Sequence, residues 1–440
     1  MNSRRALAIV AAAGLWLPGY AAWAQSTLPL RSTFDDPADQ STIIPDPNLI
    51  VVEQSPPKRR KVAGDPYAPR GISLGAITLY PSLGVGGVAT SNVQGSAKNA
   101  KADTGLALRP AIRLESDWVR HQWTAGASGD LSYYADNPDL NGRNLDIFQR
   151  LRLDVRRGTT AVLEESYVQD QAGLEESDVP ASVVGYRTEH TLASSAAVTQ
   201  DLGGFEARIK AGGVWRIFED VALSGGGTED NSDRDYVEPA LTFRATFTDP
   251  PVIKPFVEAG YAPRIHQRKF DRNGLRRDSN GYSVGAGVTL DRGPIWSGDV
   301  ALTYLRRDYE DPALKSNDAF GLNGNLTWSP TEVTRIVLSL GTSLSETSSA
   351  TSSGSRNWSI GLAASQAVRE NVDVSAGLGA NIETADTGTD VTYDASLGVA
   401  WKLNPNLSWS AGYDFTWLNA ANSDRDYTVH KISTGLTISR

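Results

Sequence analysis

The sequence has no cysteine and a single methionine in 440 residues. The lack of cysteine excludes disulfide bonds and thiolate metal ligands. Hydrophobic residues make up only 40% of the chain, and the mean hydropathy is −0.31. This low apolar content suits either a soluble β protein or a barrel whose thin apolar surface faces lipid.

Long apolar runs are also missing. After residue 24, no segment reaches the roughly eighteen consecutive apolar residues that a transmembrane helix needs, which excludes a helical membrane protein. The chain also has no excess of basic residues, because its formal net charge is −9. We therefore expect no nucleic-acid partner.

Recognisable catalytic motifs are absent too. The chain contains no Gly-x-Ser-x-Gly elbow, no His-Glu-x-x-His motif and no P-loop. We therefore predict that the protein is not an enzyme and has no cofactor and no metal site. The alternative is a His-Asp or His-Ser pair that folding assembles across strands, around His121, His190, His266 or His430.

The first 24 residues have the pattern of a secretory signal peptide. Arg4 and Arg5 precede an apolar stretch over residues 6–17, and Ala22-Trp23-Ala24 forms a small-residue cleavage site. The apolar stretch is too short for a membrane anchor. An exported mature chain has three candidate locations: the periplasm, the medium or the outer membrane.

Residues 25–70 are rich in proline and show no sustained hydrophobic period. Such a segment cannot bury a core, so we predict a disordered periplasmic tail. Its "KRRK" stretch at 58–61 is interpreted as a solvated charge run rather than a docking site for an anionic partner.

From about residue 71 to residue 440, the sequence alternates with a period of two. In "LDIFQRLRLDV" (145–155), one set of positions is almost entirely apolar and the other carries two arginines and two aspartates. A strand sends successive side chains to opposite faces, so this strand is oily on one side and charged on the other. The same alternation recurs at 104–116, 204–213, 237–247, 372–383, 393–403 and 407–418.

The predicted connections alternate between short and long. Short turns are expected near 117–120, 157–159, 203–204, 249–251, 293–294, 329–331, 369–371 and 404–406. Long polar loops are expected near 91–102, 136–144, 172–189, 221–235, 270–280, 309–318, 346–355, 384–391 and 419–426. Short turns on one side and long loops on the other are typical of outer-membrane barrels, whereas a sandwich has shorter strands and no such asymmetry.

We therefore predict an all-β fold: a transmembrane, antiparallel, up-and-down β-barrel of about 18 strands over residues 71–440, with 16 or 20 as the nearest errors. "SDRDY" occurs at 232–236 and again at 423–427, each time where a long loop ends and a strand restarts. Its tyrosine is expected near the membrane interface, where aromatic girdles form.

Charge on alternate strand positions predicts a wet interior. In a membrane barrel the apolar positions face lipid, while the other positions face water and keep their charges hydrated; in a dry core these charges would need partners. The basic residues expected to line the lumen are Arg109, Arg113, Arg150, Arg152, Arg208, Lys210, Arg244 and Arg264. Inward acids, among them Asp130, Glu164, Glu238 and Glu258, are available to pair with some of them. In the second half of the barrel, the inward positions are mostly small and neutral.

The start of the barrel resembles the β-barrel porin type 2 family of outer-membrane proteins. The likeness lies in "DPYAPRGISLGAITLYPSLGVGGVATSN" (65–92), with Gly71-Ile72, Tyr80-Pro81-Ser82, a glycine-rich step over 84–87, and Asn92. The resemblance implies a barrel in the cell outer membrane with no catalytic residues. Some similar barrels accompany systems that export surface polysaccharide.

Two functions follow as expectations. The first is a porin-like passage for hydrophilic solutes or anionic glycans, or a conduit linked to polysaccharide export components, with a basic lumen that prefers anions. The alternative is a structural or adhesive barrel with a closed lumen, whose long loops make the contacts. In either case the partner of the apolar face is outer-membrane lipid.

Overall fold

The computed structural model describes residues 65–172, 182–345 and 352–440. The predicted signal peptide and nearly all of the predicted tail lie outside these residues. Within them, two short 3-10 turns, η2 (Pro138–Leu140) and η3 (Ser423–Arg425), are the helical elements. No helix in this part of the chain is long and apolar enough to cross a bilayer.

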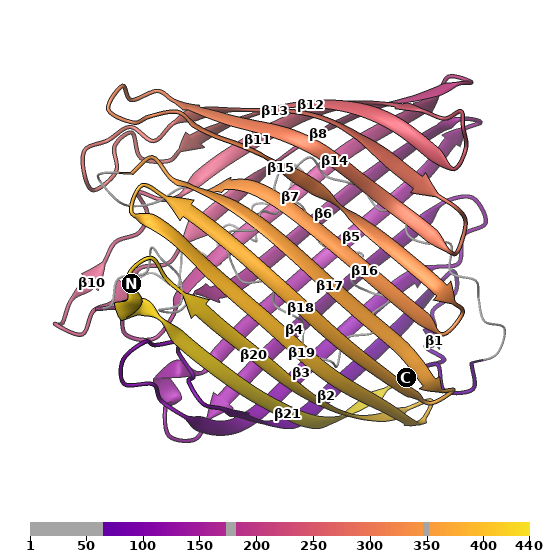
Figure 1. Cartoon of the computed structure of the whole chain (residues 1–440). Coiled ribbons are helices and arrows are strands. Elements are labelled where there is room, and N and C mark those ends of the chain that lie inside the picture. The colour runs from indigo at the N-terminus through magenta and orange to yellow at the C-terminus, as the bar shows by residue number, and fades with distance from the viewer. Residues whose placement is uncertain (1–64, 173–181, 346–351) are drawn as a thin grey trace.

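Eighteen long antiparallel strands form one closed barrel (Figure 1). They are β2 (Ile77–Thr90), β3 (Asp103–Ser116), β4 (Gln122–Tyr134), β5 (Gly142–Arg156), β6 (Thr159–Ala172), β7 (Arg187–Asp201), β8 (Phe205–Phe218), β11 (Tyr236–Phe247), β12 (Ile253–His266), β13 (Ser279–Asp291), β14 (Trp296–Tyr309), β15 (Asn317–Thr331), β16 (Thr334–Ser345), β17 (Ser355–Arg369), β18 (Val372–Ala385), β19 (Gly388–Asn404), β20 (Leu407–Asn419) and β21 (Tyr427–Ser439). Three two-residue strands are accessory: β1 (Ile72–Ser73) pairs antiparallel with the beginning of β2, and β9 (Val221–Ala222) pairs with β10 (Thr228–Glu229) within a loop.

Each barrel strand pairs with its neighbours along the chain, and the last strand closes on the first. The closing ladder between β2 and β21 runs from Ser82↔Ser439 to Thr90↔Lys431. In the described part of the chain, closure gives every barrel strand a neighbour on both sides, which is the requirement for a sheet that crosses hydrocarbon. The expected fold class and the count of 18 strands are confirmed.

The connections within the described residues alternate between short turns at one end and longer loops at the other, as predicted, with one exception. The loops predicted at 172–189 and 346–355 lie partly outside the described residues. Residues 384–391 were expected to form a long loop, but β18 and β19 stay paired up to Ala385↔Gly388 and leave a two-residue turn. The expectation was wrong because polar residues can continue a strand beyond the apolar zone. We call the two rims of the barrel the short-turn end and the long-loop end.

The two faces of the wall differ as the alternation requires. Large apolar side chains such as Ile147, Leu302 and Leu397 are exposed on one face, the face that a lipid bilayer solvates. Aromatic pairs stand near both rims: Trp296 with Trp328 close to the short-turn end, and Tyr393 with Trp417 close to the long-loop end. These pairs fit the aromatic girdles of a membrane barrel.

The repeated "SDRDY" segment closes the base of two loops. As predicted, its tyrosines begin strands, at Tyr236 and Tyr427, but both rings are buried instead of facing a membrane interface. The preceding aspartates explain the repeat. Asp235 accepts a hydrogen bond from the Phe218 N–H, and the Ala420 N–H donates to Asp426.

Because the two faces of the wall differ, the effect of an added charge on stability depends on the face that carries it. Leu397→Arg places a guanidinium in hydrocarbon near the middle of β19, and we expect it to lower the free energy of unfolding in vesicles by about 2–4 kcal/mol. The matched control is Ser396→Arg, on the opposite face and in register with Asp414, which we expect to be nearly neutral. Urea titration of tryptophan fluorescence measures both, and equal losses would contradict the assignment of the faces.

Candidate functional site

The candidate site is the charged face of the wall. Arg244 on β11 bonds Asp299 on β14, with 2.6 Å between Arg244 Nη2 and Asp299 Oδ2, although β12 and β13 lie between these strands. Neighbouring strands are about 4.8 Å apart, so a side-chain contact past two intervening strands forms only where the sheet curves toward it. These residues therefore lie on the concave face, opposite the exposed apolar side chains.

The first charged group on this face lies on β3 and β4. Arg109 Nε is 2.9 Å from Asp130 Oδ2, so the guanidinium bridges to the adjacent strand. Arg113 lies 3.5 Å from Glu115 on its own strand and stacks over the Tyr80 ring at 5.2 Å. Both arginines thus have an acidic neighbour.

The second group is centred on Glu164 of β6. Its carboxylate accepts from Arg150 on β5, and its other oxygen is 3.4 Å from Lys210 Nζ on β8. Arg152 pairs separately with Asp154 at 3.1 Å, and these two side chains remain 45% and 40% exposed. One carboxylate therefore joins basic residues across four strands, while a neighbouring ion pair stays wet.

The third group surrounds Glu238 of β11 and is almost completely buried. Arg264 Nε lies 2.5 Å from Glu238 Oε2, and Arg307 Nη2 lies 3.0 Å from the same oxygen. Arg264 also stacks over the Tyr236 ring at 4.2 Å. A carboxylate shared by two arginines in a buried position is a rigid cross-brace between β11, β12 and β14.

A small residue allows the Arg244 side chain to extend along the concave face to Asp299. Its guanidinium lies 3.6 Å from the centroid of the Phe256 ring and also approaches Glu258 at 3.9 Å on its way to Asp299. Between them, β13 presents Gly287, where a Cβ would lie 2.6 Å from the Phe256 ring. Glycine at this position is therefore needed for the close packing beneath the guanidinium.

The sequence placed eight basic residues on one face, and the structure brings some of them together. Arg150 and Lys210 share Glu164, and Arg208 stands directly opposite Arg244 in the β8–β11 register. The groups around Arg109 and Arg264 lie on separate parts of the wall. Ion pairs with an acid are formed by Arg109, Arg113, Arg150, Arg152, Lys210, Arg244 and Arg264.

Sequence reasoning missed several partners on this face. Arg307 and Asp299 were not recognised, although the alternation through Leu302 and Tyr304 assigns both to the charged side. The pairs that Glu189 makes with Arg187 and Arg216 were missed as well. The second half of the barrel is also less neutral than expected, since Asp394 accepts from Thr416 on its concave face.

The long-loop end carries a second polar network, held by Arg272. This side chain joins the loop after β12 to the loop after β8 and bonds Asp233 with two nitrogens, at 2.8 and 2.9 Å. It also bonds Glu229 at 2.6 Å and the side chain of Asn231 at 2.9 Å. Because four acceptors converge on one guanidinium, the two loops form a single rim over β8, β11 and β12.

The carboxyls of this rim titrate differently. Hydrogen bonds from Ser232 and the nearby Arg268 lower the pKa of Asp230 to about 2. Burial raises the pKa of Asp235 to about 6, and the charge on Asp230 adds to this effect. The rim therefore contains one acid that favours its charged form and one that favours its neutral form.

Residues 65–440 match the family model described as "Putative beta-barrel porin 2". The chain belongs to this family. As a member, this porin-like barrel resides in the outer membrane, with its short turns in the periplasm and its long loops outside.

Solved structures are similar to this porin-like barrel at low identity. An anion-selective porin from Comamonas acidovorans is 10% identical, with 83% of this chain and 99% of that chain covered and a TM-score of 0.37. OpdK from Pseudomonas aeruginosa is 11% identical, with 82% and 99% covered and a TM-score of 0.39. The Fiu ferric-catecholate receptor from E. coli is 10% identical, with 85% and 82% covered and a TM-score of 0.39. No curated protein sequence matches the chain.

The outer rim should loosen when its central guanidinium is removed. We expect Arg272→Gln to increase amide hydrogen exchange in the two joined loops by about tenfold, because Asp233 then loses its charged partner. Arg268→Gln is the matched control, since this exposed arginine makes one bond, to Asp230, and should change exchange little. Equal effects of the two substitutions would show that Arg272 does not join the loops.

The raised pKa of Asp235 makes the base of the loop sensitive to pH. Because the folded-state pKa of about 6 lies above the ordinary value of 3.8, the folded rim binds a proton more tightly than the unfolded chain. Protection of the Phe218 amide, corrected for the intrinsic rate of exchange, should therefore fall as the pH rises through about 4 to 6. Asp235→Asn keeps an acceptor oxygen but no titration, so its protection should stay level across this range.

Proposed function

We propose that the protein is a porin-like, water-filled passage for hydrophilic solutes across the outer membrane. The observation that carries this proposal is the half-exposed Arg152–Asp154 pair on the concave face. Charged side chains keep this exposure only where water reaches them, because burial of unpaired charge is costly. An 18-stranded barrel is also wide enough to enclose an aqueous channel.

The eight basic residues take two roles in this proposal. Arg109, Arg113, Arg150 and Arg152 line the lumen where passing solutes meet them. Arg244 and Arg264 are buried, and together with the half-buried Lys210 they stiffen the wall through their carboxylate partners, while Arg208 stands opposite Arg244 in the β8–β11 register. A stiff wall keeps a wide lumen from collapsing when no solute fills it.

The acid partners moderate the expected anion preference. With a carboxylate beside most basic groups, the lumen carries a transverse field rather than a uniformly positive potential. Arg152 has the most exposed basic side chain among these pairs, so we assign the residual attraction for anions mainly to it.

An exported glycan is a second candidate cargo. The support comes from the neutral part of the concave face, where Ser339 donates to Asn325 at 2.7 Å and small hydroxyl and amide side chains prevail. Such groups exchange hydrogen bonds with sugar hydroxyls without binding charge. Swelling of vesicles in neutral oligosaccharide and the presence of neighbouring polysaccharide-export genes test this proposal.

Planar-bilayer recording tests the passage directly. We expect steady current from the purified protein with a weak anion preference, whereas a closed scaffold with loop-mediated contacts gives no current at any voltage. Arg152→Gln should lower the anion-to-cation permeability ratio by about twofold, or roughly 0.4 kcal/mol of attraction in a screened, wet lumen. Arg306→Gln, on the opposite face, is the control and should leave the ratio unchanged. Cation selectivity of the wild type would refute the proposed role of the basic residues.

A further inference from the structure

The wall changes its construction between β15 and β16. Their backbone register runs from Thr331↔Thr334 near the short-turn end up to Gly324↔Leu340 and stops there. On their other edges the same strands are paired to the top, at Arg307↔Asn317 and Ser345↔Ser355. In the outer half of this junction, residues 317–323 and 341–345 therefore do not continue the backbone ladder; we call this region the outer joint.

The two strands overlap at the outer joint. Leu344 has the parity of the lipid-facing residues of β16, yet it is buried against Leu305 and Ala319, which lie on the concave face of β14 and β15. Trp358 packs onto the same cluster. The convex face of β16 therefore packs against the concave face of β14 and β15, so that the strands overlap here instead of lying edge to edge.

A glycine permits this overlap. A Cβ on Gly321 would lie 1.9 Å from Thr342 Oγ1, so the two layers touch where β15 has no side chain. Below the outer joint, a Cβ on Gly324 would lie 2.3 Å from the Asp299 carbonyl oxygen. Both positions require glycine because backbone or side-chain atoms of the adjoining strand occupy the space of a side chain.

Side chains replace the missing ladder. The carbonyls of Asp318, Phe320 and Leu322 lie along the edge of β15 and accept from Arg356 at 2.5 Å, Trp358 at 2.9 Å and Thr342 Oγ1 at 3.2 Å, respectively. The Thr342 N–H in turn donates to Asn323 Oδ1 at 2.6 Å. Backbone groups at membrane depth need partners, and here rotatable side chains supply them. Such bonds break by rotamer changes, whereas a ladder breaks only by moving a whole strand.

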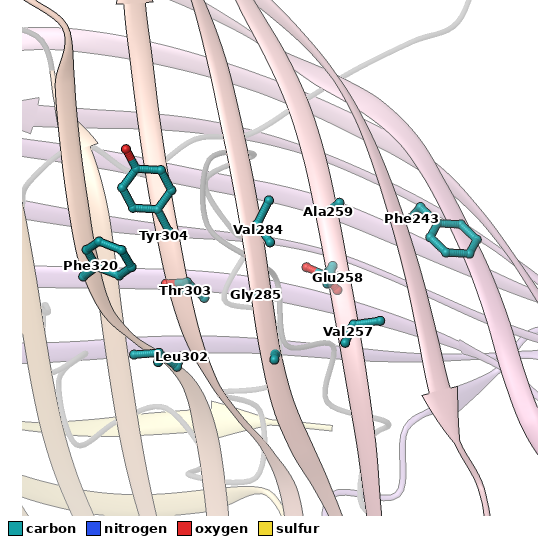
Figure 2. Close-up of a pocket in the computed structure, with 11 residues that line it drawn as sticks. Phe243, Val257, Glu258, Ala259, Val284, Gly285, Leu302, Thr303, Tyr304 and Phe320 are labelled. Carbon is teal, nitrogen blue, oxygen red and sulfur yellow. The ribbon is translucent and has the colours of Figure 1, made fainter.

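An apolar groove of about 450 Å³ leads to the outer joint on the lipid-facing surface (Figure 2). Small residues of β12 and β13, Ala259 and Ala286, lie between taller neighbours, and the groove ends at Tyr304 and Phe320, whose rings are 4.6 Å apart. The other apolar side chains that line it are Phe243, Val257, Val284 and Leu302. Phe320 is the residue whose carbonyl bonds Trp358, so the groove adjoins the outer joint directly.

We propose that the outer joint is a lateral gate through which a single-chain amphiphile passes between the lumen and the outer leaflet, with the groove holding its hydrocarbon chain. The groove opens on a surface already solvated by lipid, so a hydrocarbon chain is the occupant that its chemistry fits. At the outer joint, Ala319 and Leu344 with Leu305 of β14 offer an apolar path, and Asn323 with Thr303 of β14 offers a polar one. This function goes beyond passage of hydrophilic solutes and does not depend on it.

Opening is measured by thiol labelling, for which the cysteine-free chain is well suited. Ala319→Cys lies inside the outer joint at 3% exposure, and Ala107→Cys is equally buried on β3, far from it, at 1% exposure. In vesicles, we expect a maleimide to modify the cysteine at 319 at least tenfold faster than the one at 107. Equal rates would show that the outer joint stays shut and would overturn the gate.

Locking the outer joint tests whether the amphiphile passes through it. The pair Ala319→Cys and Leu344→Cys is joined by oxidation or by a short bifunctional maleimide, and the control pair, Leu326→Cys and Leu338→Cys, lies in the intact ladder of the same strands. The probe is lysophosphatidylcholine with a photoreactive chain in vesicles, and adducts are mapped residue by residue. Retained heat-modifiability on gels shows that each variant is folded.

Adducts on Tyr304 and Phe320 are expected in every variant, because the groove stays open to lipid. Adducts on the concave-face residues Thr303 and Asn323 are expected in the unlocked protein and the control pair, and should disappear in the locked joint and return on reduction of the disulfide. Concave-face adducts that are absent from the unlocked protein or persist in the locked one would overturn the gate. An absence of adducts at Tyr304 and Phe320 would overturn the assignment of the groove as the binding site of the hydrocarbon chain.

Discussion

The need to pair every backbone N–H and C=O in hydrocarbon governs this structure. Eighteen strands meet that need by closing on themselves through β2 and β21. At one junction, between β15 and β16, the ladder stops at Gly324↔Leu340, and side chains of Thr342 and Trp358 serve the exposed carbonyls instead. That exception obeys the same constraint by other means, which is why the wall stays continuous there although its backbone ladder ends.

Strand alternation then distributes charge. With apolar residues facing lipid, most charges on the spanning strands lie on the concave face, and curvature brings charges from non-adjacent strands into contact. Arg244 reaches Asp299 across two strands, and Glu164 holds Arg150 and Lys210. These bonds brace the wall, and they also neutralise much of the potential that a row of basic residues would otherwise create. Stiffness and selectivity are therefore set by the same side chains.

At the long-loop end, polar side chains also hold the structure together, but on a smaller scale. A loop cannot pack a core of its own at the mouth of a wide barrel, so polar contacts order it: Arg272 gathers acceptors from a neighbouring loop, and Asp235 and Asp426 tie two loop bases to backbone N–H groups. The buried Asp235 is held at some cost to its charged form, which makes this part of the rim responsive to proton concentration.

The sequence by itself determined the alternation and the strand number, because these are local properties of successive peptide units and of short turns. It did not reveal that 384–391 continues two strands, since polarity marks exposure to water and not the end of pairing. The partners of Arg264 and Arg307 and the overlap of Leu344 beneath Ala319 were decided only by the tertiary structure. Those contacts depend on how far the closed sheet curves and how its strands rotate against one another, and no single strand carries that information.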